Sequence, residues 1–189
     1  MAVDVRCVPA TAERWPDLER LFGKRGACGG CWCMYWRRTR AEFNAGKGAT
    51  NRRALMQLVE SETPPGVVAY SGEEPVGWCA VAPRDTYPTL ARSRILKPVD
   101  DAPVWSVSCL FVARPFRRKG VSEILIRAAA ELARQHGAAL VEAYPVEPKA
   151  PMADAFVWTG LAPAFVRAGF TEVARRSPTR PILRLAVRP

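Results

Sequence analysis

Histidine and long apolar runs are the two features that this sequence most conspicuously lacks. The only histidine is His136, and no second C-x-x-C pair accompanies the one at Cys28 and Cys31, so a closed zinc site has no evident fourth ligand. No apolar run approaches the roughly 20 residues that cross a bilayer. The N-terminus also lacks the charged-then-apolar layout of a signal peptide. The sequence therefore predicts a cytoplasmic protein with no membrane partner.

The chain also shows no internal repeat, low-complexity segment or second domain. Its 189 residues can bury a substantial core, and a content of 49% apolar and 24% charged residues is ordinary for a globular protein. Six cysteines in such a chain are expected to be reduced thiols rather than a disulfide framework. We therefore expect residues 1–189 to form one domain.

The N-terminal half predicts a series of short elements. Residues 1–8 alternate like a strand, and a helix is expected to begin near Trp15 with Pro16 in its first turn. The elements expected after them are a helix opened by a capping box at residues 39–42, a helix over 50–61, and a hairpin of strands over 66–70 and 76–81. The connection 83–103 is too long for an inert turn and is expected to form an ordered or mobile flap.

The stretch from Trp105 to Gly137 carries the clearest change of period. Residues 105–112 alternate, which predicts a strand, and the residues expected on one face are Trp105, Val107, Cys109 and Phe111. After Val112 the pattern breaks at Pro115 and becomes helical, with an apolar stripe of Val121, Ile124, Leu125, Ala128 and Leu132. Gly137 is expected to end this helix, and a further strand follows at 139–144.

A basic turn joins that strand to that helix. Gly120 lets the backbone approach a phosphate closely, and the first N–H groups of the helix have no internal acceptors. Arg117, Arg118 and Lys119 add positive charge around them. The arrangement suits a nucleotide or pyrophosphate group. A helix start with a solvated basic rim is the alternative, and spacing alone favours neither.

The turn itself carries a resemblance to a known family. Arg117-Arg-Lys-Gly120-Val-Ser122 resembles the R/Q-x-x-G-x-G/A signature of the GNAT superfamily of acyl-CoA N-acyltransferases, and it lies between a strand and a long helix as it does there. Residues 165–170 also resemble the short helix and Gly-Phe step near that superfamily's C-terminus. The resemblance covers about residues 66–187, the expected cofactor core. Ser122 departs from the usual Gly or Ala.

The resemblance implies an α/β (α+β) fold with a mixed central sheet of about six or seven strands flanked by helices. Strands four and five are expected to splay apart, and the backbone of the fourth to bind the pantetheine arm of acetyl-CoA, the acyl donor. The expected cofactor-binding residues are Leu110, Phe111, Val112, Arg117, Arg118, Lys119, Gly120, Val121, Ser122 and Phe165. The formal charge of +10 suits such an acidic ligand.

The resemblance leaves the proton carriers open. Many members place a tyrosine four residues before the Gly of the Gly-Phe step, where it protonates the leaving thiolate, but this chain has Phe165 there. Tyr144 is our substitute for the acid, and Glu142 is a candidate base, because alternation places both on one face of their strand. The competing interpretation is a salt-bridged Glu142 and a packed Tyr144, with no dedicated acid.

The most unusual stretch is the Cys- and Trp-rich loop over residues 26–36. Its thiols at Cys28, Cys31 and Cys33 have the right chemistry for zinc or an iron–sulfur centre. We favour the rival interpretation, a loop that borders the acceptor site and holds no metal. The candidate acceptor-binding residues are Trp32, Tyr35, Trp36 and Trp78.

Two functions from different classes follow. The first is an N-acetyltransferase in which an amine attacks the acetyl-CoA thioester directly; the sequence does not identify that amine, and it leaves a homodimer open. The second is a basic nucleic-acid-binding module stabilised by a metal at the Cys28, Cys31 and Cys33 thiols. The sequence lacks the paired C-x-x-C motifs and aromatic RNA-binding signatures that would support the second, so nucleic acid is not an expected partner.

Overall fold

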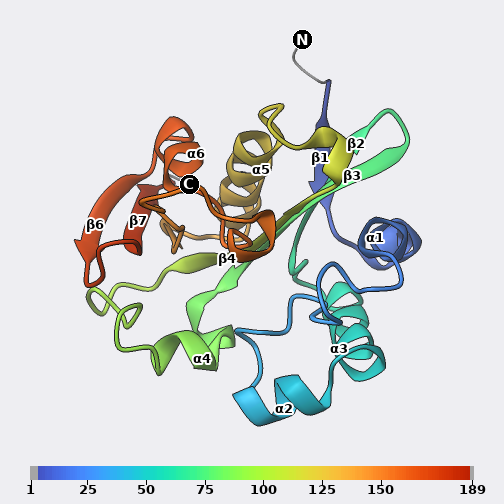
Figure 1. Ribbon diagram of the computed structural model, residues 1–189, viewed down its shortest axis with the longest axis horizontal. Coiled ribbons are helices and arrows are strands. Elements are labelled where there is room, and N and C mark those ends of the chain that lie inside the picture. Colours follow the sequence, from blue (N-terminus) through green and yellow to red (C-terminus); the bar gives the residue numbers. More distant parts are fainter. Residues whose placement is uncertain (1–3, 188–189) are drawn as a thin grey trace.

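Seven strands form one open, mixed sheet at the centre of the computed structural model, which describes residues 4–187 (Figure 1). Their spatial order is β1-β2-β3-β4-β5-β7-β6. The strands are β1 (Arg6–Pro9), β2 (Gly66–Ser71), β3 (Glu74–Pro83), β4 (Trp105–Val112), β5 (Leu140–Ala143), β6 (Thr171–Arg175) and β7 (Pro181–Ala186). The predicted mixed sheet is thus confirmed, whereas the expectation for residues 1–3 lies outside the described residues.

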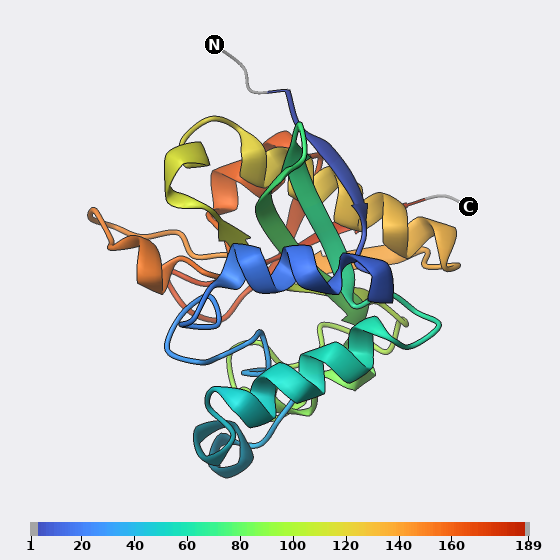
Figure 2. The same cartoon turned by 90° about the vertical axis from the view of Figure 1, so that its right-hand side faces the viewer.

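Helices cover both faces of this sheet. They are α1 (Trp15–Phe22), α2 (Arg40–Ala45), α3 (Ala49–Val59), α4 (Pro88–Ala91), α5 (Val121–Gln135) and α6 (Ala162–Arg167). Helix α5 lies across one face, and α1 and α3 lie on the other (Figures 1 and 2). No helix among the described residues is long and apolar enough to span a membrane.

Strands β4 and β5 pair in parallel, whereas every other pairing among the described strands is antiparallel. The register of the parallel pair covers only residues 105–107 of β4 against 141–143 of β5, although β4 continues to Val112. Beyond Val107 the two strands therefore separate, as the predicted splay requires. The crossover between them runs through α5, which fixes the N-terminus of that helix near the end of β4.

A β-bulge in β4 overturns the strict alternation expected for residues 105–112. Ala80 of β3 faces Cys109 and Val81 faces Val107, so Ser108 has no partner of its own. As a result Val107 and Leu110 pack into the α5 side of the core, while Cys109 packs on the α1 side. A bulge depends on how the partner strand pairs, so alternation within one strand cannot reveal it.

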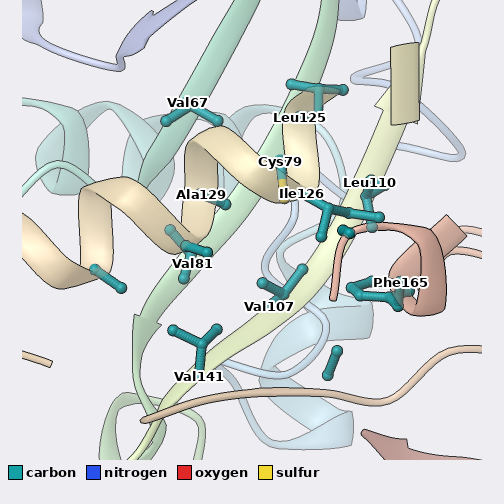
Figure 3. Packing of buried hydrophobic residues seen from close by; sticks show 14 of the residues in the cluster. Val67, Cys79, Val81, Val107, Leu110, Leu125, Ile126, Ala129, Val141 and Phe165 are labelled. Atoms are coloured by element: carbon teal, nitrogen blue, oxygen red, sulfur yellow. The ribbon is translucent and has the colours of Figure 1, made fainter. Parts of the chain in front are cut away.

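The larger core lies between α5 and the sheet (Figure 3). Leu125, Ile126 and Ala129 are fully buried against Val67 and Val81 of the strands. The buried stripe of α5 therefore differs from the predicted one, since Ile124 and Ala128 are only partly buried. Alanines occupy much of the real interface and allow the helix to pack closely, but they give a weak periodic signal.

The second core lies under α1 and α3, and the Cys- and Trp-rich loop of residues 26–36 contributes Trp32, Cys33 and Met34 to it. The predicted capping box opens α2, since Thr39 accepts a hydrogen bond from the Glu42 N–H and Glu42 accepts one from the Thr39 N–H. The long connection 83–103 is anchored by the buried side chains of Tyr87, Leu90 and Leu96, so it is an ordered flap.

Candidate active site

The turn between β4 and α5 forms one wall of a cleft of about 720 Å³. Arg118 and Gly120 have positive φ values of 59° and 84°, so the backbone curls into the concave shape that presents N–H groups to an anion. A Cβ added at Gly120 would meet no atom within 4 Å, so the left-handed conformation, and not crowding, requires glycine there. The helix dipole of α5 adds to the positive potential at this place.

Eight of the ten predicted cofactor-binding residues line this cleft, namely Leu110, Phe111, Val112, Arg117, Arg118, Gly120, Val121 and Ser122. Lys119 and Phe165 do not. The Lys119 amine lies 5.6 Å from the centre of the Phe116 ring, and Phe165 is fully buried against Phe170. The predicted cofactor roles themselves stay predictions.

The opposite wall of the cleft comes from the segment between Pro148 and Leu161. Two contacts hold this segment to β4 and to the turn that follows it. The Arg117 guanidinium pairs with the Asp154 carboxylate at 2.8 Å, and the Leu110 N–H donates to the Trp158 carbonyl at 2.7 Å. Because of the Leu110–Trp158 hydrogen bond, the chain at residue 158 lies beside β4 in the space beyond the end of β5.

Backbone direction along β4 follows from that hydrogen bond. Because the Leu110 N–H points into the splay, alternation turns the Phe111 N–H toward β3 and the Val112 N–H back into the splay. The main-chain N–H groups that face the splay are therefore those of Leu110 and Val112, whereas that of Phe111 faces β3. The Val112 carbonyl is already occupied by the Arg117 Nε, 2.9 Å away.

The four aromatic residues predicted to bind the acceptor separate into two pairs. Trp32 and Trp78 are buried in the core below the loop, where Trp32 stacks on Trp15 at 5.9 Å and the Trp78 Nε1 donates to the Cys33 sulfur at 3.1 Å. They contact the protein interior and do not line the cleft. Ala27 and Cys28 are the residues of this loop that do line it.

Tyr35 and Trp36 form an aromatic cluster with Trp158 beside the splay. The ring centroids are 4.9 Å apart for Tyr35–Trp36, 5.2 Å for Tyr35–Trp158 and 5.7 Å for Trp36–Trp158. Trp158 also lines the cleft, and its carbonyl is the group bound by Leu110. This aromatic cluster of Tyr35, Trp36 and Trp158 therefore adjoins the place where β4 leaves β5.

Two of the three loop thiols, those of Cys31 and Cys33, take part in packing, whereas Cys28 is exposed. Cys33 Sγ lies 3.2 Å from Cys109 Sγ of β4, and that thiol contact together with burial raises the pKa of Cys33 well above its usual value. Burial also raises the pKa of Cys31 to about 11, so the neutral thiol is held at neutral pH. Among residues 4–187 no group of three or more His, Cys, Asp or Glu side chains is placed to hold a metal ion.

Glu142 and Tyr144 meet, but in a buried network at the base of the splay. The Tyr144 hydroxyl contacts Glu142 Oε2 at 2.9 Å and Ser106 Oγ at 2.8 Å, and the Arg84 guanidinium contacts it as well. Burial, followed by the Glu142 charge, raises the pKa of Tyr144. Both side chains are 1% exposed and neither lines the cleft, so their catalytic roles stay predictions without added support.

Two arginines balance the Glu142 charge, and sequence reasoning missed both as site residues. Arg84, just after β3, lies 3.4 Å from Glu142 Oε2, and Arg184 of β7 donates from Nε to Oε1 at 3.1 Å. The partners come from three distant segments, so no local spacing signals them. Arg184 also pairs with Asp100 of the ordered flap, at 2.8 Å, and this second ion pair ties the flap to β7.

Comparison with known proteins agrees with this geometry. A sequence model of the Acetyltransferase (GNAT) family matches residues 31–156. None of the curated proteins matches the chain. Nothing in these comparisons supports the nucleic-acid-binding alternative.

Solved structures share the fold at low sequence identity. An acetyltransferase of the GNAT family from Listeria monocytogenes has a TM-score of 0.59 and 11% identity over 98% of this chain and 96% of its own. The PaiA N-acetyltransferase from Thermoplasma acidophilum, solved with coenzyme A, has a TM-score of 0.55 and 9% identity over 97% and 99%. A GNAT-family protein from Desulfovibrio desulfuricans has a TM-score of 0.52 and 16% identity over 98% and 99%.

Proposed function

Because this chain belongs to the GNAT acetyltransferase family, we propose that it transfers the acetyl group of acetyl-CoA to an amine that attacks the thioester directly. The observation that carries the proposal is the cleft formed by the end of β4, the Arg117–Gly120 turn and the start of α5. An anionic cofactor fits there because guanidinium groups, a left-handed backbone turn and a helix N-terminus converge on one place.

The residues of the cleft have separate roles in this proposal. The N–H groups from Arg118 to Ser122 bind the pyrophosphate, and the N–H groups of Leu110 and Val112 bind the donor's amide arm or polarise its acyl carbonyl. The Leu110 N–H is bonded to the Trp158 carbonyl in this structure, so donor binding replaces that contact. Asp154 likewise competes with the pyrophosphate for Arg117.

The chemical step conserves all atoms. The amine nitrogen forms a bond to the acetyl carbon, the carbon–sulfur bond breaks, and the amine loses one proton while the coenzyme A sulfur gains one. Because the coenzyme A thiolate is a good leaving group, positioning of the two reactants supplies most of the rate, with water carrying the proton. Tyr144 and Glu142 lie near this place but are enclosed, so we assign them to holding β4 and β5 in register.

Titration calorimetry with acetyl-CoA tests the proposal. Wild-type protein is expected to bind, and Arg117→Glu is expected to weaken binding at least tenfold, because it removes one charge-assisted contact and adds repulsion. Gly120→Val is expected to abolish binding, since a β-branched residue disfavours the positive φ that shapes the turn.

The matched control is Arg53→Glu, the same charge reversal at an exposed position of α3, which should leave the affinity unchanged. Circular dichroism and the melting temperature establish that each variant is folded. Equal acetyl-CoA affinity in folded wild type, Arg117→Glu and Gly120→Val would rule out the assigned cleft.

A further inference from the structure

Buried polar atoms without a hydrogen-bond partner lie at the aromatic cluster of Tyr35, Trp36 and Trp158. Only four such side-chain atoms occur among residues 4–187. Two of them are donors: Trp36 Nε1 in the cluster itself, and Arg180 Nε, whose guanidinium neighbours Tyr35 and bonds to the carbonyl of Tyr144, a residue of the hydrophobic cluster against which Trp36 packs. A third, Thr159 Oγ1, belongs to the residue after Trp158 and is 2% exposed. Buried donors without acceptors are rare in folded proteins, so their gathering at one place calls for an explanation.

Arg180 is the unusual member. It lies between β6 and β7, and burial lowers its pKa, an effect that the neighbouring Tyr35 partly offsets. Its Nη2 donates to the Tyr144 backbone carbonyl at 3.1 Å. By contrast with Arg84 and Arg184, which share the Glu142 carboxylate, Arg180 forms no salt bridge within residues 4–187. A partly buried guanidinium without an anion is costly, so the site is incomplete as it stands.

The position of these groups relative to the splay points to the acceptor. Trp158 is bonded through its carbonyl to Leu110 of β4, so its ring and its neighbours stand beside the strand that holds the donor. Next to them, Tyr87 lies against Ser108, the bulged residue of β4. A molecule bound at the aromatic cluster would thus reach the reacting end of the donor, and not its nucleotide end.

We propose that this cluster is the acceptor site and that the acceptor is a small primary amine that also carries a carboxylate, as an amino acid does. The Arg180 guanidinium binds the carboxylate, the Trp36 N–H donates to one of its oxygens, and the aromatic rings enclose the carbon skeleton. A carboxylate matches one guanidinium and one indole N–H, whereas a phosphate dianion would need more donors than the cluster offers. The inference rests on the acetyl transfer proposed above and specifies its substrate.

Binding at this site also requires a movement, because the unpaired atoms are enclosed. Trp158, one of the three rings of the cluster, is held to β4 through the 2.7 Å contact between its carbonyl and the Leu110 N–H. Donor binding replaces that same contact. The acceptor site is therefore expected to open when the donor is present, which gives an order in which the two substrates bind.

The test is a comparison of matched amines, in two pairs that differ only in a carboxylate and one pair that differs only in a phosphate. Release of free coenzyme A thiol is followed with phenylalanine against phenethylamine, lysine against cadaverine, and 2-aminoethyl phosphate against ethanolamine. The carboxylate-bearing member is expected to have the higher kcat/KM by about 10- to 100-fold, the range of a charged hydrogen-bonded contact. Equal use of both members, or preference for the phosphate-bearing amine, would overturn the assignment.

Variants locate the carboxylate contact. Arg180→Gln is expected to raise KM for the amino acids by about 10- to 100-fold and to leave the decarboxylated amines unchanged. Arg176→Gln is the matched control, because Arg176 lies in the same β6–β7 connection and contacts only the carbonyls of Lys97 and Pro98 among the described residues. If both variants raise KM equally, Arg180 has no special role.

A binding experiment keeps this inference separate from the acetyl transfer. Tryptophan fluorescence of the full chain, titrated with phenylalanine in the presence of coenzyme A, reports on Trp36 and Trp158 without any turnover. Saturable binding that is lost in Trp36→Phe, measured for that variant by calorimetry because the substitution removes a reporting indole, supports the site even where Arg180→Gln does not fold. If acetyl-CoA binds in the cleft but amines with and without a carboxylate are used equally, the proposed function stands and this inference is wrong.

Discussion

The two sides of the splay are built in different ways. The donor side comes from one continuous stretch, residues 105–122, in which strand, basic turn and helix follow one another and face an open cleft. The proposed acceptor side is assembled from the loop at residues 26–36, the segment around Trp158 and the β6–β7 connection at Arg180. The donor side can therefore be recognised from a local sequence pattern, whereas the acceptor side cannot.

The same difference predicts how the two sides respond to substitution. Donor-side arginines are substantially exposed, and the Arg117–Asp154 pair lies 34% and 55% exposed, so such pairs add little to stability. Beneath the acceptor side the polar groups are buried, as Glu142 at 1% shows. We therefore expect donor-side changes to alter affinity with little effect on folding, and changes beneath the splay to alter folding first.

The largest effect is expected for Glu142→Gln. This substitution removes the carboxylate that balances Arg84 and Arg184, and loss of one partner from a buried ion pair costs about 3–5 kcal/mol. Urea unfolding monitored by circular dichroism measures the change in unfolding free energy. Glu131→Gln, which breaks an exposed pair with Arg134, is the control and should change it by less than about 1 kcal/mol. Similar losses in both variants would remove the contrast between the two regions.

A smaller effect is expected for Tyr144→Phe. The hydroxyl bridges Ser106 and Glu142, so its removal should lower the unfolding free energy by about 1–3 kcal/mol. Because the side chain does not line the cleft, kcat should fall by less than about tenfold, below the 10²–10⁴-fold typical of a general acid. Steady-state kinetics under saturating acetyl-CoA decide the matter. A loss of a hundredfold or more in a stable protein would restore Tyr144 as the acid.

Cys31 is expected to affect stability only in alkaline solution, with no effect at neutral pH. Burial raises the pKa of its thiol to about 11 in the folded protein, against about 8.5 in an unfolded chain. The unfolded state then loses its proton first, so stability that is fully present below pH 8.5 declines as the pH rises toward 11. The decline attributable to this thiol is at most about 1.4 kcal/mol per pH unit. Thermal melts between pH 7 and 10.5 should show a shallower loss in Cys31→Ser, and identical slopes would contradict the shift.

Much of the fold could be predicted because its signals are local. The Thr39–Glu42 capping box, the hairpin around Gly72 and the change of period at Val121 each depend on neighbouring residues, and the structure has all three. The bulge at Ser108 could not be predicted, since it arises from the pairing with β3. The burial of Ile126 and Ala129 in place of Ile124 and Ala128 reflects how α5 lies on the sheet.

The candidate site divides along the same line. The sequence by itself determined the basic turn and Gly120, because a left-handed turn before a helix requires adjacent residues of those types. Only the tertiary structure placed Trp78 in the core rather than at the predicted acceptor site, enclosed Glu142 between two arginines, and left Arg180 beside Tyr35 without an ion pair among residues 4–187. Those outcomes depend on contacts between segments that are distant in the chain. They are decided by packing and charge compensation in three dimensions, which no local pattern of residues records.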